Sequence, residues 1–121
     1  MTLRAENITE NFTVEELNCK CGCGWSIIQY NLVHRLQVIR DIAEEPIKVL
    51  SGGRCATHNL AVGGTPGSYH LKGEAVDWCL ASGNKVRLKW LAELLKDWSG
   101  GFHYYEDRGF IHCDIGRRRR W

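Results

Sequence analysis

The chain has 121 residues, of which 44% are apolar and 25% charged, and a net charge of +2. This size and composition are typical of a globular protein with a real core, so residues 1–121 are expected to form one domain, and we expect a monomer. No apolar run approaches the roughly 20 residues of a membrane-spanning helix, so no membrane partner is expected. The N-terminus lacks a basic stretch followed by an apolar one, which predicts no secretory signal and synthesis in the cytoplasm.

Two helices are predicted in the first part of the chain. Thr13 and Glu16 have the spacing of a capping box, which predicts a short helix beginning at Thr13. Residues 27–44 carry apolar side chains at three- and four-residue steps, which predicts a longer helix that ends before Pro46. The positions of this stripe are Ile28, Leu32, Leu36, Ile39 and Ala43.

Strands and one further helix follow. Ile47–Leu50 and Ala75–Leu80 are predicted strands, and the Gly- and Pro-rich segment 52–67 between them is expected to be a loop. Asn84 is the expected N-cap of a helix that ends at Ser99–Gly101. Its predicted apolar face consists of Val86, Trp90, Leu91, Leu94, Leu95 and Trp98.

The last part of the chain predicts a hairpin. Phe102–Tyr105 and Phe110–Ile115 are its strands, joined by the charged turn 106–109. Because helices come first along the chain and strands later, we expect an α+β domain with an antiparallel sheet and helices packed on one side.

A candidate metal site lies in the segment from His70 to Asp77. Asp77 falls in an apolar predicted strand, where an unpaired buried carboxylate would be costly. Gly73 lets the chain turn so that both side chains can converge. In the last strand, alternation places His112 and Asp114 on one face. From the residues alone, either a catalytic metal with three protein ligands or structural histidines with satisfied hydrogen bonds would fit.

Several motifs resemble, in order along the chain, the zinc D-alanyl-D-alanine peptidase family, which includes murein endopeptidases, carboxypeptidases and phage endolysins. The similarity extends from about residue 11 to the end of the chain. The motifs are Ser51-Gly-Gly-Arg54, Asn59, Val62-Gly-Gly64, Ser68-x-His70-x-x-Gly73-x-Ala75-x-Asp77, Gly100-Gly101, Tyr105 and Gly109-Phe-Ile-His112-x-Asp114.

The resemblance implies one catalytic zinc ion at the sheet, bound by His70, Asp77 and His112. It implies that Arg54 binds a substrate carboxylate or carbonyl and takes part in catalysis, and that Ser68 supports the site and the substrate. The implied substrate is the peptide stem or cross-link of peptidoglycan, reached after release from the cytoplasm or delivery to the cell wall. A non-catalytic wall-binding module stabilised by zinc is the alternative function.

The general base is the point at which the sequence departs from many relatives, which carry Asp or Glu three residues before the last histidine ligand. Gly109 occupies that position here. Asp114 is the favoured replacement, with Glu106 or Asp107 in the turn as alternatives. Asp114 could equally orient a ligand histidine.

Two further features leave alternatives open. Cys19, Cys21 and Cys23 form a cluster whose spacing is unusual for a zinc knuckle, so a structural metal, free thiols or a disulfide to Cys55 are all considered. The basic run 117–120 could contact nucleic acid or an anionic wall polymer, but a solvated tail is the favoured interpretation. No nucleic-acid partner is therefore expected.

Overall fold

The computed structural model describes residues 7–24 and 27–121. No helix in this part of the chain is both long and apolar enough to cross a membrane. The elements in chain order are α1 (Val14–Leu17), α2 (Tyr30–Ala43), β1 (Ile47–Ser51), α3 (Ala56–Ala61), the 3-10 helix η1 (Tyr69–Lys72), β2 (Ala75–Leu80), α4 (Lys85–Leu94), β3 (Gly101–Tyr105), β4 (Phe110–Asp114) and β5 (Arg119–Arg120).

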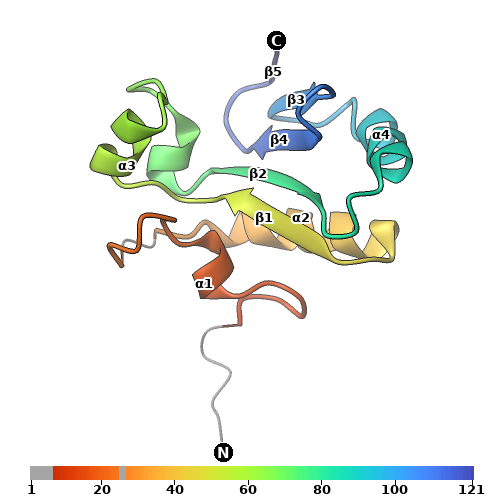
Figure 1. Cartoon of the computed structure of the whole chain (residues 1–121), viewed down its shortest axis with the longest axis horizontal. Helices are drawn as coiled ribbons and strands as arrows, with labels where there is room; N and C mark the ends of the chain where they lie inside the picture. Colours follow the sequence, from red (N-terminus) through yellow and green to blue (C-terminus); the bar gives the residue numbers. More distant parts are fainter. Residues whose placement is uncertain (1–6, 25–26) are drawn as a thin grey trace, which may run out of the picture.

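The five strands form one sheet in the order β1-β2-β4-β3-β5 (Figure 1). Neighbouring strands are antiparallel except β3 and β5, which run parallel. The α+β class is confirmed, but the expectation of a purely antiparallel sheet is wrong. After β4 the chain turns back along the sheet, so that Arg119 and Arg120 pair with Gly101 and Phe102 in the same direction.

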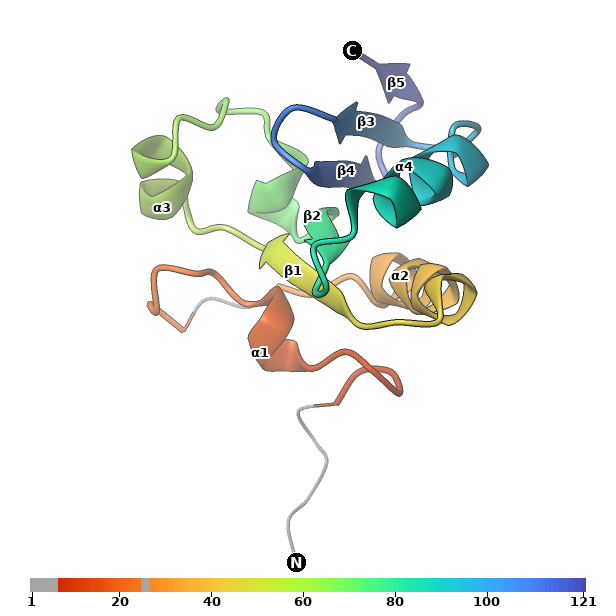
Figure 2. The ribbon, with the colours of Figure 1, turned by 45° about the vertical axis from the view of Figure 1, so that its right-hand side comes forward.

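The core lies between one face of the sheet and helices α2 and α4. Figure 2 shows these two helices on one side of the strands and α3 on the other, so the one-sided arrangement does not hold for α3. Alternate residues of β2 and β4 enter this core, which leaves the intervening polar residues on the opposite face. The buried core includes Leu32, Val33, Leu36, Ile39, Val76, Trp78, Leu88, Leu91, Ile111 and Cys113.

The predicted helix starts are confirmed where a side chain caps them. The Thr13 hydroxyl accepts from the backbone N–H of Glu16, and the Glu16 carboxylate accepts from that of Thr13. The Asn84 side chain caps α4 by accepting from the N–H of Arg87. Helix α2, however, begins at Tyr30 rather than near residue 27.

The predicted apolar face of α4 is partly wrong. The helix ends at Leu94, and its core positions are Leu88, Leu91 and Ala92, whereas Val86 is 83% exposed. Trp98 lies beyond the helix and donates from Nε1 to the backbone carbonyl of Asp114. The segment expected to be a loop also contains a helix, α3.

The interpretation of the basic run as a solvated tail is wrong for three of its members. Arg118 donates to the backbone carbonyls of Asp97 and Trp98. Arg119 donates to the carboxylate of Asp114, and the Arg120 guanidinium donates to the backbone carbonyls of Gly100, Lys96 and Trp98. These contacts fasten the segment after β4 to the sheet and to the end of α4.

Candidate metal centre

Three of the predicted site residues meet on the sheet face that is turned away from α2 and α4. His70 comes from η1, Asp77 from the middle of β2 and His112 from β4, where it is the direct cross-strand partner of Asp77. One ligand atom of each side chain lies within 4.8 Å of the others. Strand pairing therefore fixes two of the three donors, and η1 brings the third.

The local sequence explains why His70 points at Asp77. The Ser68 hydroxyl caps η1 by accepting from the N–H of His70, and Gly73 ends it in the left-handed conformation at φ 68°. The Nδ1 atom of His70 lies 2.7 Å from the carbonyl oxygen of Gly52. Since a carbonyl can only accept, Nδ1 carries the proton, and Nε2 faces Asp77 Oδ2 at 3.3 Å.

Asp77 is half-buried among cationic and imidazole groups. Burial alone would raise the pKa of its carboxyl, but the hydrogen bonds and charges of His112 and His70 outweigh burial and hold this pKa well below its ordinary value. Arg54 adds a third neighbour, with its guanidinium 3.6 Å from Asp77 Oδ2. The carboxylate is therefore ionised at neutral pH.

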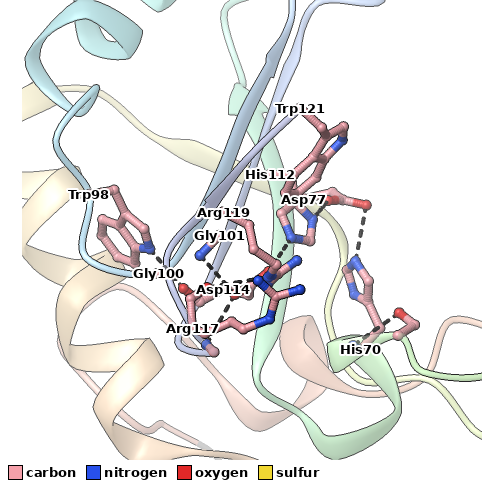
Figure 3. Close-up of polar contacts among 12 residues, drawn as sticks. His70, Asp77, Trp98, Gly100, Gly101, His112, Asp114, Arg117, Arg119 and Trp121 are labelled. Atoms are coloured by element: carbon pink, nitrogen blue, oxygen red, sulfur yellow. Dashed lines mark hydrogen bonds and ion pairs between the residues drawn. The ribbon is translucent and has the colours of Figure 1, made fainter.

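His112 lies between two carboxylates (Figure 3). Its Nδ1 atom is 2.8 Å from Asp77 Oδ1, and its Nε2 atom is 2.8 Å from Asp114 Oδ2. Burial lowers the pKa of this imidazole, but the hydrogen bonds to Asp114 and Asp77 outweigh it and raise the pKa above its ordinary value. Two carboxylates around two imidazoles form a site that favours a cation.

Asp114 is fully buried, and both of its oxygens are occupied. Oδ1 accepts from the backbone N–H groups of Gly101 and Gly116, and Oδ2 accepts from Arg119 and His112. Burial raises the pKa of this carboxyl, but its donors outweigh that effect and lower it. Asp114 thus lies one step further from the candidate metal position, behind the ring of His112.

The donor set fits a divalent metal of the zinc type. Two imidazole nitrogens and one carboxylate oxygen are a ligand combination found in catalytic zinc sites, which leave one position for water or substrate. The hydrogen bonds of His70 to a carbonyl and of His112 to a carboxylate are those that usually orient metal-binding histidines. The chemistry of the three side chains is therefore compatible with the predicted ion.

A cavity of about 320 Å³ opens in front of these residues. The predicted residues Arg54 and Ser68 line it, and Arg54 is held by Ser51 Oγ and Asn59 Oδ1 at 3.1 and 3.2 Å. Its remaining walls include Tyr69, Tyr105, Arg119 and Trp121.

None of these four wall residues was identified as a site residue from the sequence, although Tyr105 belonged to one of the motifs. Arg119 and Trp121 reach the cavity because of the parallel pairing of β5, which no local pattern indicated. The Trp121 ring lies 5.1 Å from that of His112 and donates from Nε1 to the Tyr105 hydroxyl. Tyr69 precedes the first histidine in η1, so the Ser-x-His motif was the one signal that could have pointed to it.

The hairpin turn explains why no acid stands before the last histidine. Gly109 has φ 75°, a left-handed conformation that disfavours any residue with a side chain, and its N–H donates to the carbonyl of Tyr105. Glu106 and Asp107, the predicted alternatives in this turn, line neither this cavity nor its neighbour. Glu106 instead lies 3.6 Å from Lys89, with both side chains exposed.

The fold and the site together define a small α+β domain with a candidate metal site on one face of its sheet. Comparison with known proteins gives a more specific result: the sequence model of the peptidase M15 family matches residues 10–114. The chain therefore belongs to the peptidase M15 family, which confirms the resemblance drawn from its motifs.

A curated relative supports the same assignment. The chain is 33% identical over 93 residues to a protein of Haemophilus influenzae named as a probable peptidoglycan L,D-endopeptidase, MepK. The match covers 73% of this chain and 49% of the relative. The chain thus spans about half the length of the curated protein it matches.

Proposed function

We propose that this protein is a zinc-dependent peptidase that hydrolyses peptide bonds in the stem or cross-link peptides of bacterial peptidoglycan. The observation that carries the proposal is the convergence of His70, Asp77 and His112 at the wall of an open cavity. Membership of the peptidase M15 family and the named activity of the Haemophilus relative support the substrate class.

His70, Asp77 and His112 are the residues that would hold the zinc ion. Such an ion supplies a Lewis acid for an amide carbonyl and lowers the pKa of water. The protein's part is to keep Nε2 of His70 and Nδ1 of His112 free of protons and aimed at one point. The Gly52 carbonyl does this for the first ring, and Asp114 for the second.

Arg54 is proposed to bind a carboxylate or carbonyl of the substrate peptide. Its side chain is only 13% exposed, and two neutral groups, Ser51 Oγ and Asn59 Oδ1, hold it in place. Its planar guanidinium can therefore face the substrate without losing its supports. Ser68 lines the same cavity and keeps the turn of His70 in place, which is the role proposed for it.

The cavities favour cleavage within a chain over removal of a terminal residue. A second cavity, of about 690 Å³, adjoins the first, and Arg54, Asp77 and Tyr105 line both. A peptide could therefore extend from the three candidate ligands past Arg54 and Asp77 into the second cavity. We propose an endopeptidase on this ground.

The contacts of Asp114 support an orienting role rather than that of general base. Both of its oxygens already accept two hydrogen bonds each, and its side chain has no exposed surface. Glu106 and Asp107 do not line the cavities. We therefore expect Glu106→Gln and Asp107→Asn to retain turnover within about twofold, as surface changes usually do.

The test is digestion of purified peptidoglycan followed by mass analysis of the released peptides. Zinc-loaded protein should create new peptide ends, and chelation should abolish this until zinc is restored. His70→Ala and His112→Ala should lose both zinc and activity, whereas His34→Ala, on the exposed face of α2, should keep both. If the zinc-loaded protein leaves every murein peptide bond intact yet sediments with cell walls, the wall-binding module is the correct function.

A further inference from the structure

Four cysteines from two distant segments gather beside Arg54, which directly precedes one of them. Cys19, Cys21 and Cys23 lie in the turns after α1, and Cys55 is the N-cap of α3. All are free thiols. One sulfur atom from each of the four lies within 4.8 Å of the others.

The separations among three of the sulfur atoms have the size expected for ligands of one ion. The Sγ atoms of Cys19 and Cys21 are 3.4 Å apart, and each lies 3.7 Å from Sγ of Cys55. Zinc–thiolate bonds of about 2.3 Å in a tetrahedron place the sulfur atoms about 3.8 Å from one another. A single disulfide would bond only two of the four sulfur atoms and would leave the other two as free thiols.

Two backbone N–H groups also point at sulfur atoms of the cluster. The N–H of Cys55 donates to Cys19 Sγ at 3.4 Å, and the N–H of His58 donates to Cys55 Sγ at 3.3 Å. Hydrogen bonds from N–H groups are strongest when the acceptor carries charge. Four thiolates this close would repel one another unless a cation lay between them.

We propose that Cys19, Cys21, Cys23 and Cys55 bind a second zinc ion, with a structural role. Four thiolates fill all positions of a tetrahedral ion, which leaves none for substrate or water. The fourth ligand, Cys55, comes from a segment 32 positions further along the chain than Cys23, so the unusual spacing of the first three is no obstacle.

This ion would fasten the loop after α1 to the segment that supports the candidate peptidase centre. Gly53 already donates to the carbonyl of Leu17 at 2.9 Å, and a side chain on Gly52 would collide with the Leu17 backbone. Gly52 provides the carbonyl that orients His70, and Arg54 precedes Cys55 directly. The proposed second zinc site therefore holds the Gly52 carbonyl and Arg54 in place beside the candidate peptidase centre. It does so without contacting substrate.

Metal content of the purified full chain tests the proposal independently of peptidase activity. Native mass spectrometry under reducing conditions should find two zinc ions in the wild type. One should remain in Cys21→Ser, in Cys23→Ser and in His70→Ala, and none in the Cys23→Ser/His70→Ala double variant. Cys79→Ser, a matched change of a partly exposed cysteine in β2, should retain both.

Cobalt substitution provides a second measurement that needs no change to the cluster. In His70→Ala loaded with cobalt(II), the four thiolates should give strong sulfur-to-cobalt charge-transfer bands and the spectrum of a tetrahedral ion. Absence of these bands, or a wild type that holds one zinc ion which His70→Ala removes, would overturn the proposal. So would peptide mapping that finds Cys55 in a disulfide when the protein is isolated with zinc present.

Discussion

The Nε2 atom of His112 lies 2.8 Å from Oδ2 of Asp114, while Nδ1 of the same ring faces Asp77 at the same distance. The buried carboxylate of Asp114 thus holds the His112 ring on its Nε2 side, and Nδ1 points toward the candidate metal position. Asp114 is anchored in turn by two backbone N–H groups and Arg119. The orientation of the ring is therefore set by the sheet rather than by the metal.

Asp114→Asn should weaken zinc binding about 10- to 100-fold, the usual effect of changing a group that orients a metal ligand. Within the hydrogen-bond pattern shown, an amide nitrogen in place of Oδ2 would face the donors of both His112 and Arg119. Competition with a chromophoric chelator measures the affinity. Asp107→Asn, in the exposed turn, is the control and should bind zinc normally.

The same variant separates the two roles considered for Asp114. Wild-type zinc affinity combined with a loss of most turnover would assign the general base to Asp114 and contradict the orienting role. Loss of affinity, with turnover partly restored at saturating zinc, is the outcome that the contacts predict.

Arg119→Gln should lower the free energy of unfolding by about 1.5–3 kcal/mol, the range for a hydrogen bond to a charged group. Its guanidinium contacts the fully buried Asp114, which otherwise accepts from the imidazole of His112 and two backbone N–H groups. Urea unfolding of the metal-free protein measures the effect. Arg117→Gln, two positions away and exposed, should change stability by less than about 0.5 kcal/mol.

Equal stabilities of these two variants would contradict the anchoring role of Arg119. They would restore the interpretation of the basic run as a hydrated tail.

Arg54→Lys should lower kcat/KM about 10- to 100-fold while leaving zinc content unchanged. A lysine keeps the charge but loses the planar pair of donors, and one hydrogen bond to a charged group is worth about 1.5–3 kcal/mol. Steady-state rates on a soluble stem peptide, together with metal analysis, test this. Arg117→Lys is the matched control, and zinc loss in Arg54→Lys would show that Arg54 supports Asp77 instead of the substrate.

The parts of the fold that the sequence predicted are those with a local pattern. Ala75–Leu80 is a strand as predicted, because a short apolar run is bounded by turn residues. The pairing of β5 was missed because Arg119 and Arg120 have no strand pattern, and their position depends on Asp114 and the carbonyls after α4. Long-range contacts of this kind leave no local signal.

In the candidate site, too, the features with a local sequence pattern were predicted and those that depend on long-range contacts were not. His70, Asp77 and His112 could be named from their motifs, and strand alternation alone placed His112 beside Asp114. The role of Asp114 could not be decided, because alternation gives the face of a residue but not the number of donors around it. The sequence left a structural metal, free thiols and a disulfide to Cys55 open, because the approach of Cys55 to the earlier cysteines depends on long-range contacts such as that of Gly53 with the Leu17 carbonyl.

Thiol labelling should occur in three stages that reflect the surroundings of the six cysteines. In the native zinc-loaded protein only the partly exposed Cys79 should react at mildly alkaline pH. Chelation should release the four thiols of the proposed second site. Cys113 should react last, because complete burial raises the pKa of its thiol to about 12 and keeps the reactive thiolate scarce.

Stepwise counts with a chromogenic disulfide reagent, before chelation, after it and in denaturant, measure these stages. Cys113→Ala should remove the final stage alone, and Cys79→Ser the first. Reaction of the cluster thiols before chelation would show that no ion protects them. Reaction of Cys113 after chelation but before denaturant is added would show that the core between β4 and α2 opens when zinc is removed.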